Sequence, residues 1–230
     1  MKRSIILSLA ITLLAAPASG FKQENLDKLK ATNACEMCDL RETYLREANL
    51  FRANLRKANL FRTYLREANL TGANLREANL SNADLTGAEL NFANLFRANL
   101  RKADLSDSDL REANLAGADL SDSDLRKANL SNADLDKAQL AFADLREANL
   151  RDSDLRKADL RKADLSDSDL AGADLRKADL RKTDLTGAEL NFADLRDSDL
   201  RDSDLRKTDL TGTAFCNTMM PDGSVNNADC

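Results

Sequence analysis

Leucine occupies every fifth residue without interruption from Leu40 to Leu210, and the residue two places earlier is mostly Ala, sometimes Ser or Thr. An α-helix would rotate successive leucines by about 140° and scatter them over all faces. In a flat strand, leucines five residues apart would alternate sides. A chain that turns at regular intervals avoids both problems. The spacing therefore predicts a coil in which a small residue and a leucine point inward, a polar residue between them points outward, and two free positions form each corner.

The motif A-(D/N)-L-x-x runs from Ala48-Asn49-Leu50 through Ala178-Asp179-Leu180 and resembles the pentapeptide-repeat proteins. This resemblance covers about four fifths of the chain. It implies an all-β fold, a right-handed quadrilateral β-helix with four pentapeptides in each coil. Thirty-five leucines and Phe215, which takes the same place in a thirty-sixth repeat, give about nine coils over residues 35–215. With a spacing of about 4.8 Å between coils, we expect a rod about 40 Å long with a solid core.

Residues 1–20 have the pattern of a secretory signal peptide: Lys2 and Arg3, then an apolar run, then small residues. The alternative is a transmembrane anchor, but the apolar run is short for that purpose. We expect cleavage after Ala18 or Gly20 and no stable membrane anchor afterwards. The predicted location is outside the cytoplasm, in the periplasm or the extracellular space, or in the thylakoid lumen if the source is photosynthetic.

Residues 21–34 break the repeat and carry Phe21, Leu26 and Leu29 among charged residues, which indicates a short helix. An open β-helix end exposes unpaired backbone groups, so a cap is expected there. We interpret this segment as an N-terminal cap. A helix that binds a partner is the alternative.

Cys35 and Cys38 form a CxxC motif at the start of the repeats, at places where a leucine and a small residue would stand. Redox motifs and zinc sites also use this spacing. The βαβ context of thioredoxin-like motifs is absent, and the chain has no histidine and no second CxxC to complete a zinc site. In an exported protein we expect a disulfide.

The five-residue pattern weakens after Leu210, and Cys216 and Cys230 flank a turn signal at residues 221–223. Bonded cysteines need Cα atoms within about 7 Å, so pairing between the two ends of a rod is excluded. The remaining connectivity joins Cys216 to Cys230. Residues 216–230 are therefore expected to form a C-terminal cap closed by a disulfide.

Residues twenty apart should lie one above the other, which places Tyr44 and Tyr64 on one face in adjacent coils. Such a pair can stack. The two tyrosines are a weak candidate for a partner contact, and ordinary packing along the face is the alternative. The other outward aromatic residues are scattered over different faces, which needs no special explanation.

Charge varies along the rod. Residues 40–100 contain 9 basic and 6 acidic residues, whereas residues 101–210 contain 20 basic and 27 acidic residues. Asn gives way to Asp before the leucine, so stacked ladders such as Asp159, Asp179 and Asp199 are expected. Interspersed Arg and Lys can offset their repulsion. The simplest interpretation is a solvated surface with many ion pairs, and the alternative is an acidic rod that competes for a basic groove.

The family resemblance implies one way in which an acidic rod could compete for a basic groove, because some pentapeptide-repeat proteins resemble duplex DNA and bind type II topoisomerases. The expected signal peptide, the absence of an apolar C-terminal helix and the interspersed basic residues argue against it here. We therefore predict an exported, monomeric structural or protein-interaction scaffold with an unknown protein partner and no nucleic-acid ligand. The alternative is a DNA-mimicking protein that binds a topoisomerase or another DNA-binding enzyme.

Catalysis has little support in this sequence. The chain lacks histidine, and its Ser and Asp residues fill repeat positions without forming a unique constellation. No loop supplies a converging set of oxygen ligands for calcium. We expect no enzyme activity, no cofactor and no metal site.

Overall fold

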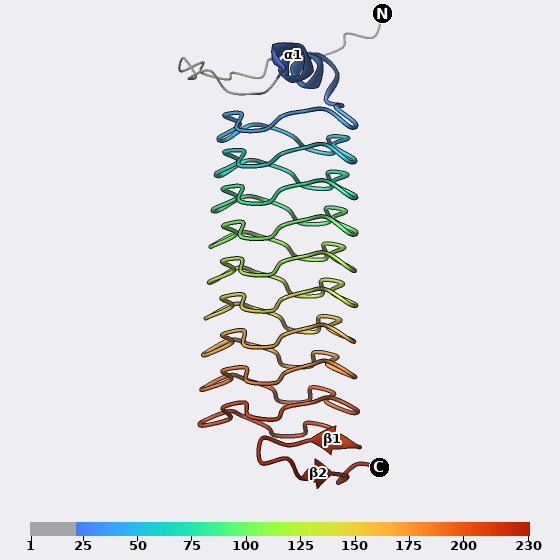
Figure 1. Cartoon of the computed structure of the whole chain (residues 1–230), viewed down its shortest axis with the longest axis vertical. Coiled ribbons are helices and arrows are strands. Elements are labelled where there is room, and N and C mark those ends of the chain that lie inside the picture. Colours follow the sequence, from blue (N-terminus) through green and yellow to red (C-terminus); the bar gives the residue numbers. More distant parts are fainter. Residues whose placement is uncertain (1–21) are drawn as a thin grey trace, which may run out of the picture.

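The computed structural model describes residues 22–230, in which the chain winds as one straight stack of coils (Figure 1). The expected signal peptide lies outside the described residues. Parallel backbone bridges join residues twenty apart, as in Asn54 with Asn74 and Asp159 with Asp179. Each coil therefore contains four pentapeptides, and the fold is the right-handed quadrilateral β-helix that the family resemblance implies.

Each corner of the coil is a tight four-residue turn. The leucine carbonyl accepts a hydrogen bond from the N–H of the small residue three places later, as in Leu55 and Ala58 at 3.0 Å. The second free position has a positive φ, as a type II turn requires, and it is occupied mostly by charged residues rather than by glycine. Glu42 has φ 57° and Lys157 has φ 59°. Each coil thus holds several non-glycine residues in the left-handed region.

Backbone hydrogen bonds connect the coils in both directions. The leucine N–H donates to the carbonyl of the polar residue in the next coil, as from Leu75 to Asn94 at 2.8 Å. The N–H of the polar residue donates to a carbonyl in the preceding coil, as from Asn94 to Ala73 at 2.9 Å. Each side of a coil makes only one bridge, so regular strands within residues 22–230 occur only at the C-terminal end.

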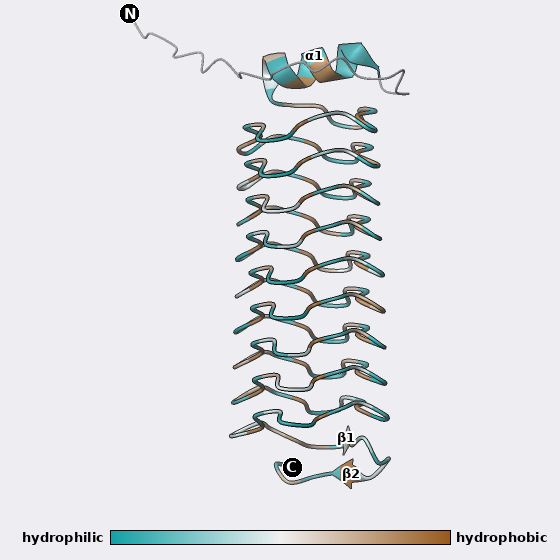
Figure 2. Ribbon diagram, turned by 90° about the vertical axis from the view of Figure 1, so that its left-hand side faces the viewer, coloured by the Kyte–Doolittle hydropathy of each residue, from teal (hydrophilic) through white to brown (hydrophobic). Residues whose placement is uncertain are grey.

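The interior is a solid column of side chains. The leucines from Leu40 to Leu200 are almost completely buried, and the alanines two places before them fill the space between. Figure 2 shows the resulting alternation of apolar and polar residues in every coil. Where serine replaces alanine before the last coil, its hydroxyl donates to a leucine carbonyl, as from Ser108 to Leu105 at 2.6 Å. These hydroxyl groups need no partner outside the coil, whereas the buried Oγ of Ser203, near the C-terminal end, makes no hydrogen bond within the described residues.

One helix, α1 (Gln23–Thr32), lies across the first coil (Figures 1 and 2). Leu26 and Leu29 are buried against the coil and join its core. The helix ends at Asn33, whose φ of 53° gives a left-handed cap. The helix covers the N-terminal end of the leucine column, within the segment expected to form a cap.

The C-terminal end carries a small antiparallel hairpin of β1 (Thr218–Met219) and β2 (Val225–Asn226). The hairpin lies below the last coil (Figure 1). Leu205 and Leu210 near this end are only partly buried, so this end is less completely covered than the body of the rod. Within the described part of the chain, no helix combines the length and apolar character needed to span a bilayer.

Candidate interaction surface

The polar residue before each leucine shapes the corner that follows. Its Oδ1 accepts a hydrogen bond from the backbone N–H two places later, as in Asn69 with Thr71 at 3.0 Å and Asp104 with Ser106 at 3.0 Å. The short side chains of Asn and Asp place an acceptor at this reach, which is the geometry of an Asx turn. This structural role was not among the predictions, which took these residues only as outward polar groups. Their regular spacing two residues before each corner was the available signal.

Arginine at the first free position binds the aspartate two residues earlier. Arg161 donates to both carboxylate oxygens of Asp159, from Nε at 2.7 Å and from Nη2 at 2.6 Å. Its Nε also lies 3.6 Å from Asp179 in the next coil. Arg181 repeats the arrangement between Asp179 and Asp199. The aspartate ladders are thus interleaved with arginines, which offsets the repulsion between like charges.

These contacts lower the pKa of several ladder carboxyl groups. Hydrogen bonds from Arg161 hold the pKa of Asp159 below its ordinary value against the opposing effect of burial. Arg196 has the same effect on the pKa of Asp194. The ladder carboxylates are therefore stabilised in their charged form.

Tyr44 and Tyr64 lie in adjacent coils with their rings stacked, 4.6 Å between centroids and 4° between planes. Both are nearly half exposed, at 46% and 43%. The same column continues with Asp84 and further aspartates, so within the described residues the two tyrosines are the only aromatic residues of this column. The structure thus brings the two predicted contact residues together on the surface near the N-terminal end.

The four cysteines form two bonds, one at each end of the rod. Cys35 is bonded to Cys38, and both are buried in the first coil. Cys216 is bonded to Cys230, which ties the chain end to the last coil. Both pairs therefore link residues that are close in sequence, as expected, and the described residues contain no free cysteine.

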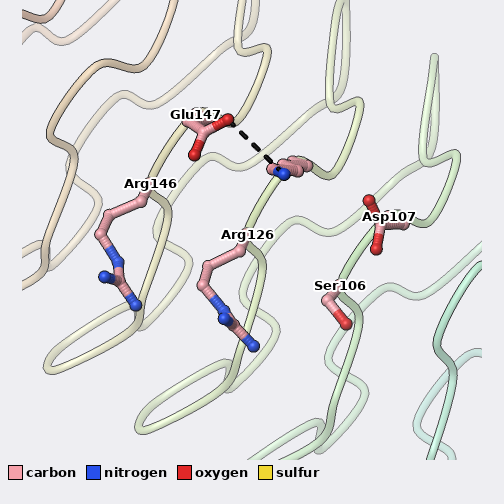
Figure 3. Close-up of a pocket in the computed structure, with 6 residues that line it drawn as sticks. Ser106, Asp107, Arg126, Arg146 and Glu147 are labelled. Atoms are coloured by element: carbon pink, nitrogen blue, oxygen red, sulfur yellow. Dashed lines mark ion pairs between the residues drawn. The ribbon is translucent and has the colours of Figure 1, made fainter.

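The hollows on this surface are shallow and lined by charged corners. One is lined by Ser106 and Asp107 together with Arg126, Lys127, Arg146 and Glu147. Figure 3 shows Arg126 and Arg146 extending side by side from consecutive coils. Lys127 pairs with Glu147 at 3.8 Å. No group of three His, Cys, Asp or Glu side chains in residues 22–230 is arranged to hold a metal ion. The geometry offers a patterned surface rather than an enclosed reaction site.

Comparisons with known proteins agree with this architecture. The model of the pentapeptide repeats family matches in eight copies, over residues 36–66, 63–101, 103–138, 133–170, 163–202 and 183–220. No curated protein sequence matches the chain.

Solved structures of pentapeptide-repeat proteins also match. HetL, involved in heterocyst differentiation regulation in the cyanobacterium Nostoc sp. strain PCC 7120, is 33% identical, with a TM-score of 0.53 over 87% of this chain and 98% of HetL. QnrB1, a plasmid-mediated fluoroquinolone resistance protein, is 22% identical, with a TM-score of 0.44 over 78% and 92% of the two chains. A protein from the Arabidopsis thaliana thylakoid lumen is 28% identical, with a TM-score of 0.23 over 49% and 71%. The match of the family model over most of the chain and the likeness to HetL establish that the chain belongs to the pentapeptide-repeat family.

Proposed function

We propose that the protein is an exported, non-catalytic scaffold that binds a protein partner through its outward side chains. The observation that carries this proposal is the solid leucine column. Because the interior is uniform, the repeats differ mainly in their outward side chains, which lie on a regular backbone. Pentapeptide-repeat proteins are generally structural or interaction proteins. HetL is involved in regulation, and a regulatory role of that kind is compatible with a binding surface.

The stacked pair of Tyr44 and Tyr64 is the proposed partner contact. Tyrosine provides a large contact area at low conformational cost and is enriched at protein interfaces. The pair is fixed by the coil spacing, so a partner would meet a surface that is already ordered.

A photo-crosslinking experiment in the native organism tests this contact. A photoreactive phenylalanine analogue replaces Tyr64 in one variant and Asp124 in a control variant, since Asp124 lies in the same column farther along the rod. We expect one protein to be captured from Tyr64 and not from Asp124. Equal capture from both positions, or capture of no protein, would reject the tyrosine contact.

Export is supported by the N-terminal sequence pattern and by the two disulfides, which persist in oxidising compartments. Intact mass measurement on fractionated cells, with and without reduction, tests it. We expect loss of the residues up to Ala18 or Gly20, a rise of about 4 Da on reduction, as two bonds require, and recovery outside the cytoplasm. A full-length, reduced, cytoplasmic protein would contradict the proposal.

DNA mimicry has less physical support in this chain. A mimic must present uncompensated negative charge, whereas many of the ladder aspartates are bound by arginines, as in Arg176 with Asp174 and Asp194. A supercoiling assay with a type II topoisomerase is expected to show no effect of the protein.

A further inference from the structure

Charge is distributed unequally around the circumference of the rod. Because residues twenty apart are stacked, each side of the rod consists of one seven-residue segment from every coil. A segment contains the three extended residues and the two-residue corner at each end, so each corner belongs to two adjoining sides. One side, here called the basic face, comprises residues 56–62 and the equivalent segments every twenty residues through 196–202. It carries 18 basic and 9 acidic residues. The opposite side, from 46–52 through 186–192, carries 8 basic and 11 acidic residues.

The largest positive excess in two consecutive coils lies in the C-terminal half of the basic face. Residues 156–162 and 176–182 both read RKADLRK, which places eight basic residues around two aspartates. On the opposite side of the same coils, residues 166–172 and 186–192 contain three acidic residues and no basic residue. This part of the rod therefore has a positive side and a negative side.

The arginines and lysines of these two coils differ in their partners. Arg156, Arg161, Arg176 and Arg181 are all bound to ladder aspartates. Four exposed lysines on the same coils make no ion pair within residues 22–230, and Lys162 alone of them lies over a ring, that of Phe142 at 4.8 Å. These lysines are Lys157, Lys162, Lys177 and Lys182. Their charges are available to a partner.

The four lysines border one flat side of the β-helix. Lys157 and Lys177 lie in one corner column, and Lys162 and Lys182 lie in the other. Adjacent coils are about 4.8 Å apart, and the three extended residues between the corners span about 10 Å. Arg161, Lys162, Arg181 and Lys182 also line a shallow groove along one corner. A flat partner would therefore contact both lysine columns at once.

We propose that the basic face binds the surface of an anionic lipid membrane, with the rod lying lengthwise on it. Lysine acts as a flexible point charge, and juxtaposed lysines attract anionic headgroups without a specific pairing geometry. The two adjoining sides carry aspartates, such as Asp154 and Asp164. A polymer that curves around the corners would meet these carboxylates, whereas a plane meets the basic face alone. This binding is reversible and independent of the proposed protein contact at Tyr44 and Tyr64.

Vesicle flotation tests the proposal. The mature protein is mixed with phosphatidylcholine vesicles that contain about 30% phosphatidylserine or none, in about 0.05 M and about 0.2 M salt. We expect binding to the anionic vesicles alone, weakened by salt. The variant K157Q/K162Q/K177Q/K182Q should bind at least about 30-fold more weakly. The control K28Q/K30Q/K127Q/K207Q has the same net charge and should bind like the wild type, since none of its changes lies on the basic face.

Circular dichroism confirms that both variants are folded before the comparison. Equal losses in the two variants would show that overall charge controls binding and would overturn the proposal. Failure of the wild type to prefer anionic vesicles would also overturn it. Binding to heparin or single-stranded DNA without binding to vesicles would assign the face to a soluble polyanion instead.

Discussion

The N-terminal and C-terminal parts of the rod have the same backbone but fill the position before the leucine differently. In residues 40–100 this position is mostly Asn, and neighbouring coils are linked by amide contacts such as Asn79 to Asn59 at 3.1 Å. In residues 101–210 it is mostly Asp, and the coils are linked through arginines such as Arg181 between Asp179 and Asp199. Asn and Asp both supply the Oδ1 acceptor for the corner, so this acceptor role does not require charge. Charge at this position can therefore vary along the rod, and at many corners of the C-terminal part an arginine accompanies the aspartate.

The largest effects should be the same in both parts, because the core does not distinguish them. Leu75→Ala and Leu175→Ala each remove a completely buried side chain from the column. We expect each to lower the free energy of unfolding by about 2–5 kcal/mol, and the two losses to agree within about 1 kcal/mol. Urea unfolding followed by circular dichroism measures both. A much smaller loss at one site would show that the two parts unfold separately.

Removing the turn acceptor should cost less, and more in the C-terminal part. Asn94→Ala removes the hydrogen bond from the N–H of Phe96 and should cost about 1 kcal/mol. Asp194→Ala also leaves Arg196 and Arg176 without their shared carboxylate, so its cost should be larger. Asp194→Asn keeps the acceptor and should recover most of the loss. If it recovered nothing, charge rather than the turn would determine this position.

Acid should weaken the C-terminal part selectively. Hydrogen bonds from Arg161, Arg196 and Arg201 lower the pKa of Asp159, Asp194 and Asp199 below the value of 3.8 for a free aspartate. A carboxyl group with a lowered pKa stabilises the folded state above its unfolded pKa and loses that contribution as the pH falls through its folded pKa. The melting temperature should therefore fall by a few degrees below about pH 4. The variant D159N/D194N/D199N should show a flatter pH profile; an unchanged profile would contradict this account.

The smallest expected effect concerns the left-handed corner position. Lys182 has φ 62° and Asn82, five coils earlier in the same column, has φ 57°. Asn tolerates this region better than Lys does. Lys182→Gly should raise the free energy of unfolding by about 0.5 kcal/mol, whereas Asn82→Gly should leave it nearly unchanged. Thermal unfolding of the two variants makes the comparison, and an equal gain at both sites would show that residue type does not matter there.

Much of this molecule was predictable from the sequence, because the leucine spacing admits few solutions. The twenty-residue stacking placed Tyr64 on Tyr44 and Asp179 on Asp159, and both predictions needed only counting once the length of a coil was known. The family resemblance supplied the four sides that made this counting possible.

Two features were not predicted. The positive φ at residues such as Glu42 and Lys157 has no local signal, since tertiary stacking imposes a conformation that glycine or asparagine would signal elsewhere. The unequal charge around the rod was overlooked because charges were compared along the chain. Lys157 and Lys177 are distant in sequence and adjacent in space, so only the stacked arrangement reveals their common side.

The length of the coil, twenty residues, determines on which side of the rod each surface side chain lies. Deleting one pentapeptide would preserve the leucine column and every corner, yet it would move each later side chain by one side and divide the basic face between two sides. Deleting four pentapeptides would shorten the rod and leave every column intact. The segments TGAELNFANL at 86–95 and TGAELNFADL at 186–195 are separated by a whole number of coils and so present their side chains in the same direction. Insertions and deletions that preserve binding should therefore come in multiples of a full coil, although the core alone would accept any multiple of five.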